Sequence, residues 1–253
     1  MLYAWTEKPR LKSFFLSKSS LLLSADEKTA CSQKPQQHDR AAPLLHFICK
    51  EIPVLHEWAE KVGVRLVIAA LPGTFAAPDR ALAYIYPDSG GLAEIDYQCI
   101  IESFEIGKER LFEDDPRFGL VVLSEIVGRA LSPAVNDPGT AISIIGTFQR
   151  LFTLWNEPAP QDDLNTVKYD RIAVPELSIR DMFDDAFTSL ARDGAGVVEV
   201  SIRLQKAFHS LASLGDSDIK EATEYHANLA LKRAEIALDI EEDFNAIKKA
   251  ANR

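Results

Sequence analysis

The feature that most constrains the fold is a pair of Asp-Pro dipeptides, Asp115-Pro116 and Asp137-Pro138, each followed by apolar residues at helical spacing. Proline favours the first position of a helix, because its missing N–H costs no hydrogen bond there. The aspartate before it can accept hydrogen bonds from the unpaired amides of the first turn. We therefore predict helices over residues 116–131 and 138–155, each capped by its aspartate.

The turn between these helices is short. Pro133 disfavours the α-helical region for Ser132 and so ends the first helix, which leaves only a few residues to reverse the chain. We call residues 132–140 the elbow. Polar groups beside a helix N-terminus can bind an anionic or polar ligand, but the same groups can serve as pure architecture. Both interpretations stay open, and the candidate ligand-binding residues are Arg110, Asp115, Arg129, Ser132, Asn136, Asp137 and Thr140.

The stretch before the elbow indicates a small antiparallel β unit. Apolar runs at residues 64–71 and 81–86 flank the turn dipeptide Pro72-Gly73, and Pro87 closes the second run. Short runs bounded by such turns favour hairpins, because a parallel pair needs a crossover of a dozen or more residues. A short helix from Pro53, ending at Gly63, precedes this unit.

Helical spacing dominates the remainder of the chain, and the fold class we predict is α+β, with the small antiparallel β unit packed against a larger, mainly α-helical part. His209 and His226 lie alone on helical patterns and are expected at or near the surface. Further helices are predicted at 95–106, 179–191, 197–214 and 218–250, and a strand at 167–174. The expected domains are a poorly ordered segment 1–42, a small α/β-hairpin unit 43–91 and a mainly helical domain 92–253.

Composition excludes some classes of partner. The chain has 38 acidic and 28 basic residues and a formal charge of -10, which disfavours binding to nucleic acids or to anionic lipid. Its three cysteines are odd in number and widely spaced, which indicates a reducing compartment and predicts a cytoplasmic chain. The longest apolar runs, such as residues 66–78, are shorter than the ~20 residues of a membrane helix, so no membrane span is expected.

Motifs for catalysis are absent from the sequence, which contains no phosphate-binding loop, dinucleotide fingerprint, nucleophile elbow or His-Glu-x-x-His. Cys31, His38, His46 and Cys49 have zinc-ligand chemistry but not the compact paired spacing of zinc modules. We therefore assign no catalytic residue, no cofactor and no metal site from the sequence.

The residues on both sides of the elbow follow a known sequence pattern, Arg-Thr-x-x-Gln-Asp-x-x-Phe-Gly followed by Ala-Leu-Ser-Pro-Gly/Ala-x-Asn-Asp-Pro-x-Thr-Ala. The matching positions are Arg110, Asp115, Phe118, Gly119, Ala130, Leu131, Ser132, Pro133, Asn136, Asp137, Pro138, Thr140 and Ala141. Leu111 stands in place of the Thr of the pattern and Asp114 in place of its Gln, so the polar roles of that Thr and Gln are not carried over to these two positions. With these residues the chain resembles a bacterial family of predicted membrane proteins, domain of unknown function 2254, over about residues 55–238.

The resemblance implies a function only in outline. Members of the family carry N-terminal membrane helices that residues 1–54 do not match, so the chain resembles the water-exposed portion alone. We expect a non-enzymatic interaction or regulatory domain, whose partners are membrane-protein subunits or a second copy of itself. The alternative is an enzyme or small-ligand-binding protein with a polar site at the Ser132–Thr140 elbow.

Overall fold

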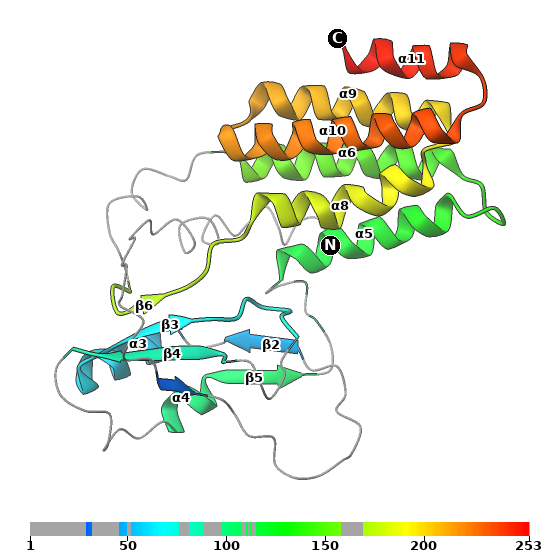
Figure 1. Cartoon of the computed structure of the whole chain (residues 1–253). Helices are drawn as coiled ribbons and strands as arrows, with labels where there is room; N and C mark the ends of the chain where they lie inside the picture. Colours follow the sequence, from blue (N-terminus) through cyan, green and yellow to red (C-terminus); the bar gives the residue numbers. More distant parts are fainter. Residues whose placement is uncertain are drawn as a thin grey trace. The chain divides into compact units, whose positions relative to one another are not determined.

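The computed structural model divides the chain into two compact units (Figure 1). The sheet unit comprises Met1–Asp115 and Ala159–Glu176, and the helical unit comprises Pro116–Pro158 and Leu177–Arg253. The predicted boundaries at residues 42 and 91 stay predictions, and segment 1–42 lies outside the described residues apart from Thr29–Cys31. The structure describes residues 29–31, 46–49, 52–75, 81–88, 98–107, 110, 112, 115–157 and 169–252.

The larger sheet of the sheet unit has the strand order β1-β4-β3-β6. Strands β3 (Val64–Ile68) and β4 (Ala83–Pro87) pair antiparallel, which confirms the predicted hairpin. β1 (Thr29–Cys31) adds a further antiparallel strand beside β4. β6 (Ile172–Ala173) pairs parallel to β3, so the sheet is mixed rather than wholly antiparallel. Its register aligns Leu66 with Ile172.

A second, two-stranded sheet corrects the predicted helix at 95–106. Within that range the structure describes residues 98–106, of which α4 (Gln98–Glu102) is helical, while β5 (Phe104–Gly107) begins soon after it. β5 pairs antiparallel with β2 (His46–Cys49), whose backbone supplies hydrogen-bond partners for the later strand. Pairing with a segment more than fifty residues earlier outweighs a weak local preference for helix.

The core of the sheet unit forms where α3 (Ile52–Val62) covers the sheet. Alternate residues of β3 are buried, as expected for a strand with one face in the core. Leu55 and Ala59 point from one face of α3 into the same cluster. Gly63 ends the helix at φ 73°, a conformation that favours glycine, and its N–H bonds to the Ala59 carbonyl.

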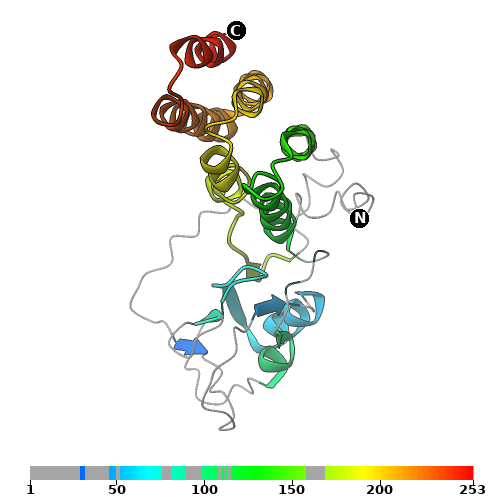
Figure 2. The same ribbon diagram turned by 90° about the vertical axis from the view of Figure 1, so that its right-hand side faces the viewer.

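The described part of the helical unit consists of six helices, all close to predicted positions except at the end of the chain. Residues 218–250 form two helices rather than one, with the break at Leu238–Ile240. Figure 2 looks nearly along the helix axes and shows α11 at the outer edge, beside α9 and α10. The helices are α5 (Pro116–Ala130), α6 (Pro138–Trp155), α8 (Ile179–Asp193), α9 (Val198–Leu214), α10 (Ser217–Ala237) and α11 (Glu241–Ala251).

Five phenylalanines form the aromatic core of the helical unit. Phe187 lies among the rings of Phe148, Phe152, Phe183 and Phe208, with centroid distances of 4.9–5.7 Å. The residues come from α6, α8 and α9, and all are buried. Packing of these rings joins three helices that follow one another along the chain. The α+β class is thus confirmed, and none of the described helices has the length and apolar character needed to cross a membrane.

Candidate functional site

The elbow is closed by its own backbone hydrogen bonds. The Ser132 N–H donates to the Arg129 carbonyl at 3.2 Å, and the Asn136 N–H donates to the Ser132 carbonyl at 2.9 Å. The Ser132 hydroxyl also donates to the Arg129 carbonyl, at 2.7 Å. Asn136 has a φ of 47°, a left-handed conformation that asparagine tolerates better than most residues. The polar groups of this turn therefore complete the end of α5.

Asp137 caps α6, as predicted. One of its carboxylate oxygens accepts from the Thr140 N–H at 3.1 Å, and the other accepts from the Thr140 hydroxyl at 2.5 Å. The hydrogen bond from the Thr140 hydroxyl is the main cause that lowers the pKa of Asp137, and the Thr140 and Gly139 amides lower the pKa further. Both carboxylate oxygens are thus engaged within the first turn of the helix.

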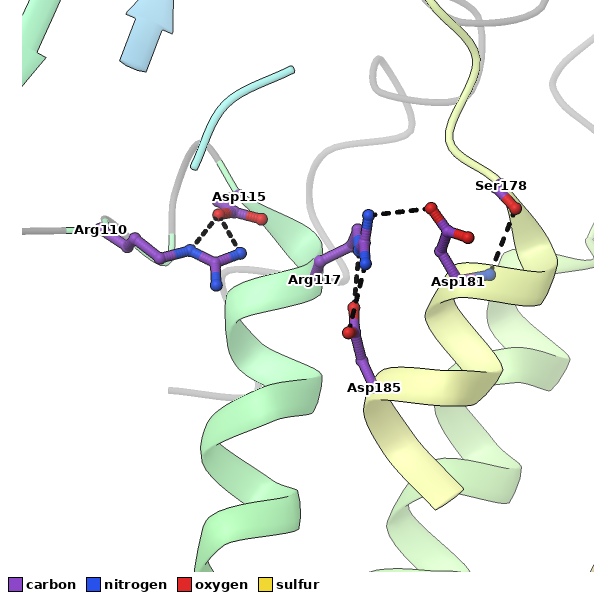
Figure 3. A network of polar contacts seen from close by, with 6 residues as sticks. All are labelled: Arg110, Asp115, Arg117, Ser178, Asp181 and Asp185. Carbon is purple, nitrogen blue, oxygen red and sulfur yellow. Dashed lines mark hydrogen bonds and ion pairs between the residues drawn. The ribbon is translucent and has the colours of Figure 1, made fainter. Parts of the chain in front are cut away.

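Arg110 and Asp115 form a shielded ion pair in the sheet unit. The Asp115 Oδ2 atom lies 2.6 Å from Nε and 2.5 Å from a terminal nitrogen of Arg110. Figure 3 shows the Arg110 guanidinium directed at the Asp115 carboxylate. The Asp115 side chain is only 3% exposed. Gly73 lies against this pair with a φ of 79°, and a Cβ atom there would be 1.8 Å from Asp115 Oδ2. The Pro72-Gly73 turn therefore needs glycine both for its backbone conformation and for its contact with the pair.

The candidate residues do not form one cluster. Asp115 immediately precedes α5 and Ser132 follows its last turn, so the fifteen residues of the helix separate them by about 22 Å. Arg110 pairs with Asp115, whereas Asp137 pairs with Thr140 at the other end. Arg129 and Asn136 are exposed. The elbow and the ion pair are therefore two separate polar features.

One polar contact of the helical unit was absent from the sequence-based candidates. Arg117 on α5 makes a forked contact with Asp185 on α8, at 2.6 and 3.2 Å, and reaches Asp181 at 3.1 Å (Figure 3). Asp181 and Asp185 are one helical turn apart, a spacing that indicates a shared face. The Ser178 hydroxyl accepts from the Asp181 N–H and caps α8. The fork thus holds α5 beside α8.

His226 contradicts the expectation of a surface position. It is 1% exposed and lies among the aromatic rings, whereas His209 is exposed as predicted. Its Nε2 atom is 3.0 Å from a carboxylate oxygen of Asp184. Burial is the main cause that lowers the pKa of His226, the Asp184 carboxylate opposes this, and the charges of Arg180 and Arg233 lower the pKa further. A lone histidine on a helical pattern gave no signal of this burial.

A comparison with known protein families agrees with the resemblance described for the residues around the elbow. The model of the DUF2254 family, described as a predicted membrane protein, matches residues 51–210. Proteins described as uncharacterised, from Mycobacterium bovis and from two strains of Mycobacterium tuberculosis, are each 39% identical to the chain over 67 residues. The matched segment covers 26% of this chain and 13% of each relative, so the match spans a small part of those proteins. No solved structure matches the chain.

Proposed function

Because the chain belongs to the DUF2254 family of predicted membrane proteins, we propose that its described part is a non-enzymatic interaction or regulatory domain. It acts by docking onto membrane-embedded protein subunits on the cytoplasmic side. The proposal rests on the hydrogen bonds that the polar groups of the elbow already make. The Asp137 carboxylate and the Ser132 hydroxyl both bond to neighbouring groups of their own turn, which supports a structural rather than a catalytic role for them.

The electrostatics of the elbow support an architectural role. A general acid or base at neutral pH needs a pKa near the working pH, whereas the Thr140 hydrogen bonds lower the pKa of Asp137 and keep the carboxylate charged. The nearest candidate cation, Arg129, is exposed, so water screens its charge. The same sequence that resembles the family pattern thus supplies a rigid connection between α5 and α6.

The charge of the whole chain supports docking onto protein rather than onto lipid. A formal charge of -10 is repelled by the anionic surface of the cytoplasmic leaflet, so long-range attraction to the membrane itself is unfavourable. A membrane-embedded protein subunit offers apolar and hydrogen-bonding contacts that do not depend on that surface charge. Self-association is the other form of docking that such a domain can use.

The experiment is co-expression of the chain with a family member that carries membrane helices, followed by separation of membranes from the soluble fraction. We expect the chain to sediment with membranes only when that partner is present. Cells that lack the partner are the control, and light scattering of the purified chain tests for a second copy as the partner.

The proposal would be refuted by a chain that remains in the soluble fraction with the partner present and is monomeric at all concentrations. The rival interpretation, an enzyme or small-ligand site at the elbow, gains if small molecules raise the melting temperature. That shift must disappear in Arg129→Ala and Asn136→Ala, whose side chains are exposed at the elbow.

A further inference from the structure

We propose that His56, Glu60 and Asp170 of the sheet unit form a binding site for a divalent transition-metal ion of the zinc type. One ligand atom from each of these residues lies within 4.8 Å of the other two. The site is separate from the elbow and does not depend on the function proposed above. It also differs from the Cys31-to-Cys49 series considered in the sequence.

Two of the three side chains share one face of α3. His56 and Glu60 are four residues apart, so they lie one helical turn from each other. The Nε2 atom of His56 is 3.7 Å from an oxygen of Glu60. The Nδ1 atom is 3.9 Å from an oxygen of Asp170, which lies just before β6. Carboxylates therefore approach the imidazole from two sides.

The backbone on both sides of the site is fixed by the core. Leu55 and Ala59 anchor α3 in the buried cluster, which sets the outward direction of the intervening turn. The Leu66 N–H donates to the Arg171 carbonyl at 2.9 Å, where β6 joins the sheet next to β3. That bond positions Asp170, one residue earlier in the chain. The two halves of the site are thus held by the same sheet.

The ligand atoms must move closer together to bind one ion, and the two exposed carboxylates can make this movement. Zinc bonds of about 2.0–2.1 Å in a tetrahedral arrangement place neighbouring ligand atoms roughly 3.3 Å apart. The separations of 3.7 and 3.9 Å are measured from the two different nitrogens of His56, and one ion binds only one of them. The three ligand atoms lie within 4.8 Å of one another, so they must move closer by up to about 1.5 Å to reach the zinc spacing. The side chains of Glu60 and Asp170 are 58% and 68% exposed, so both can rotate to close the remaining gap.

The imidazole of His56 is the part of the site that is already in place. Its side chain is 15% exposed, and its ring meets the Tyr169 ring edge-on at a centroid distance of 5.5 Å. The Nδ1 atom is shielded from water and makes no hydrogen bond among the described residues. Leaving a shielded nitrogen of this kind without a partner costs free energy. A metal ion can serve as the partner, because a neutral imidazole nitrogen can donate its lone pair to it.

The nearby charges favour a cation. Glu60 and Asp170 bring two carboxylates to the imidazole, while the neighbouring Arg171 is bonded to Asp88. The guanidinium of Arg171 is thus held by Asp88. A metal ion would therefore compete with Arg171 only through the longer-range attraction of the guanidinium for the carboxylates of Glu60 and Asp170.

The ligand types indicate the class of metal. Magnesium and calcium prefer sites made of oxygen alone, whereas an imidazole nitrogen suits zinc, cobalt, nickel and related ions. One nitrogen and two carboxylates are three protein ligands, which leaves a fourth position for water. We therefore expect zinc to bind and magnesium to bind far more weakly.

The test is calorimetric titration of the tag-free, EDTA-treated full chain with Zn²⁺, and separately with Mg²⁺. We expect one equivalent of zinc to bind. His56→Ala, Glu60→Gln and Asp170→Asn should each weaken binding by at least ~10-fold, since loss of a group that merely orients a ligand already costs ~10–100-fold. The matched controls are Glu57→Gln, an exposed carboxylate on the same helix, and His209→Ala, an exposed histidine; both should bind as the parent chain does.

Absence of zinc binding would overturn the proposal, and so would binding that the three variants leave unchanged. Cobalt identifies the ligand atoms independently, because a thiolate charge-transfer band would assign the metal to cysteine and would also refute the site. If His56→Ala fails to fold, Glu60→Gln and Asp170→Asn decide the question, because both side chains are largely exposed and circular dichroism can verify their folding.

Discussion

Replacement of Arg110 by methionine should strongly destabilise the sheet unit. Asp115 is 3% exposed, and two nitrogens of Arg110 lie at 2.5 and 2.6 Å from one of its oxygens. Breaking a buried ion pair from one side costs about 3–5 kcal/mol, because the other charge stays in a poorly solvated place. Arg110 itself is 21% exposed, which puts our expectation near the lower end, at about 3 kcal/mol.

The double variant Arg110→Met/Asp115→Leu should be less destabilised than Arg110→Met alone. It removes both charges, and apolar replacements for a buried ion pair are often close to neutral in stability. A double-mutant cycle with Asp115→Leu then gives the interaction energy of the pair. The exposed Arg129→Met is the control, with a change of less than about 0.5 kcal/mol in the free energy of unfolding.

The assay is urea unfolding followed by the fluorescence of Trp58. This residue packs against the core of the sheet unit, whereas Trp155 belongs to α6. Replacing Trp5 and Trp155 by phenylalanine leaves a reporter for the sheet unit alone. An unchanged urea midpoint in Arg110→Met would refute the reasoning. It would mean that water solvates Asp115 as well as Arg110 does, so that the ion pair does not stabilise the fold.

Three further predictions concern the helical unit. Phe187→Ala should lower the free energy of unfolding by about 3–5 kcal/mol in urea denaturation, because it leaves a cavity among four other phenylalanine rings. A loss below about 1 kcal/mol would contradict this, since it would mean that the neighbouring side chains fill the cavity. Burial lowers the pKa of His226 below 6.5, so the unfolded chain binds its proton first as the pH falls, and the melting temperature should drop below about pH 6.5. His226→Gln should reduce that dependence while His209→Gln keeps it, and equal pH profiles would contradict this cause. Asp137→Ala should destabilise the helical unit more than Asp137→Asn, because asparagine can still accept from the Thr140 amide; equal melting temperatures would count against the cap.

The elbow and the β3–β4 hairpin could be predicted because their causes are local. Pro116 and Pro138 mark the first residues of α5 and α6, and Asp137 makes the cap that its position indicates. The Pro72-Gly73 turn likewise separates two strands that pair with each other. In each case the residues that determine the structure are neighbours in sequence.

The misses have causes that lie elsewhere in the chain. β5 becomes a strand because β2 pairs with it, and β6 joins β3 in a parallel register that no local pattern specifies. His226 is buried because α10 packs against helices that carry the phenylalanines. The break before α11 did have a local signal, since three acidic residues fill its first turn and two lysines its last, the charge pattern of a separate helix.

The candidate site divides in the same way. The cap of Asp137 followed from its neighbours, whereas the partner of Arg117 on α8 lies 64 to 68 residues away. The metal site proposed above was not assigned from the sequence, although His56 and Glu60 have the spacing of one helical turn. The third proposed ligand, Asp170, is brought near them by the β3–β6 pairing, which no local pattern specifies.

The interleaving of the two units has a consequence for how the protein is made. The sheet unit takes its last strand, β6, from residues that follow α5 and α6, and both of those helices belong to the helical unit. On the ribosome, the chain therefore delivers two of the six described helices of the helical unit before the sheet acquires that edge. No single cut can release either unit intact, and a nascent chain must hold both unfinished until residue 176 has emerged.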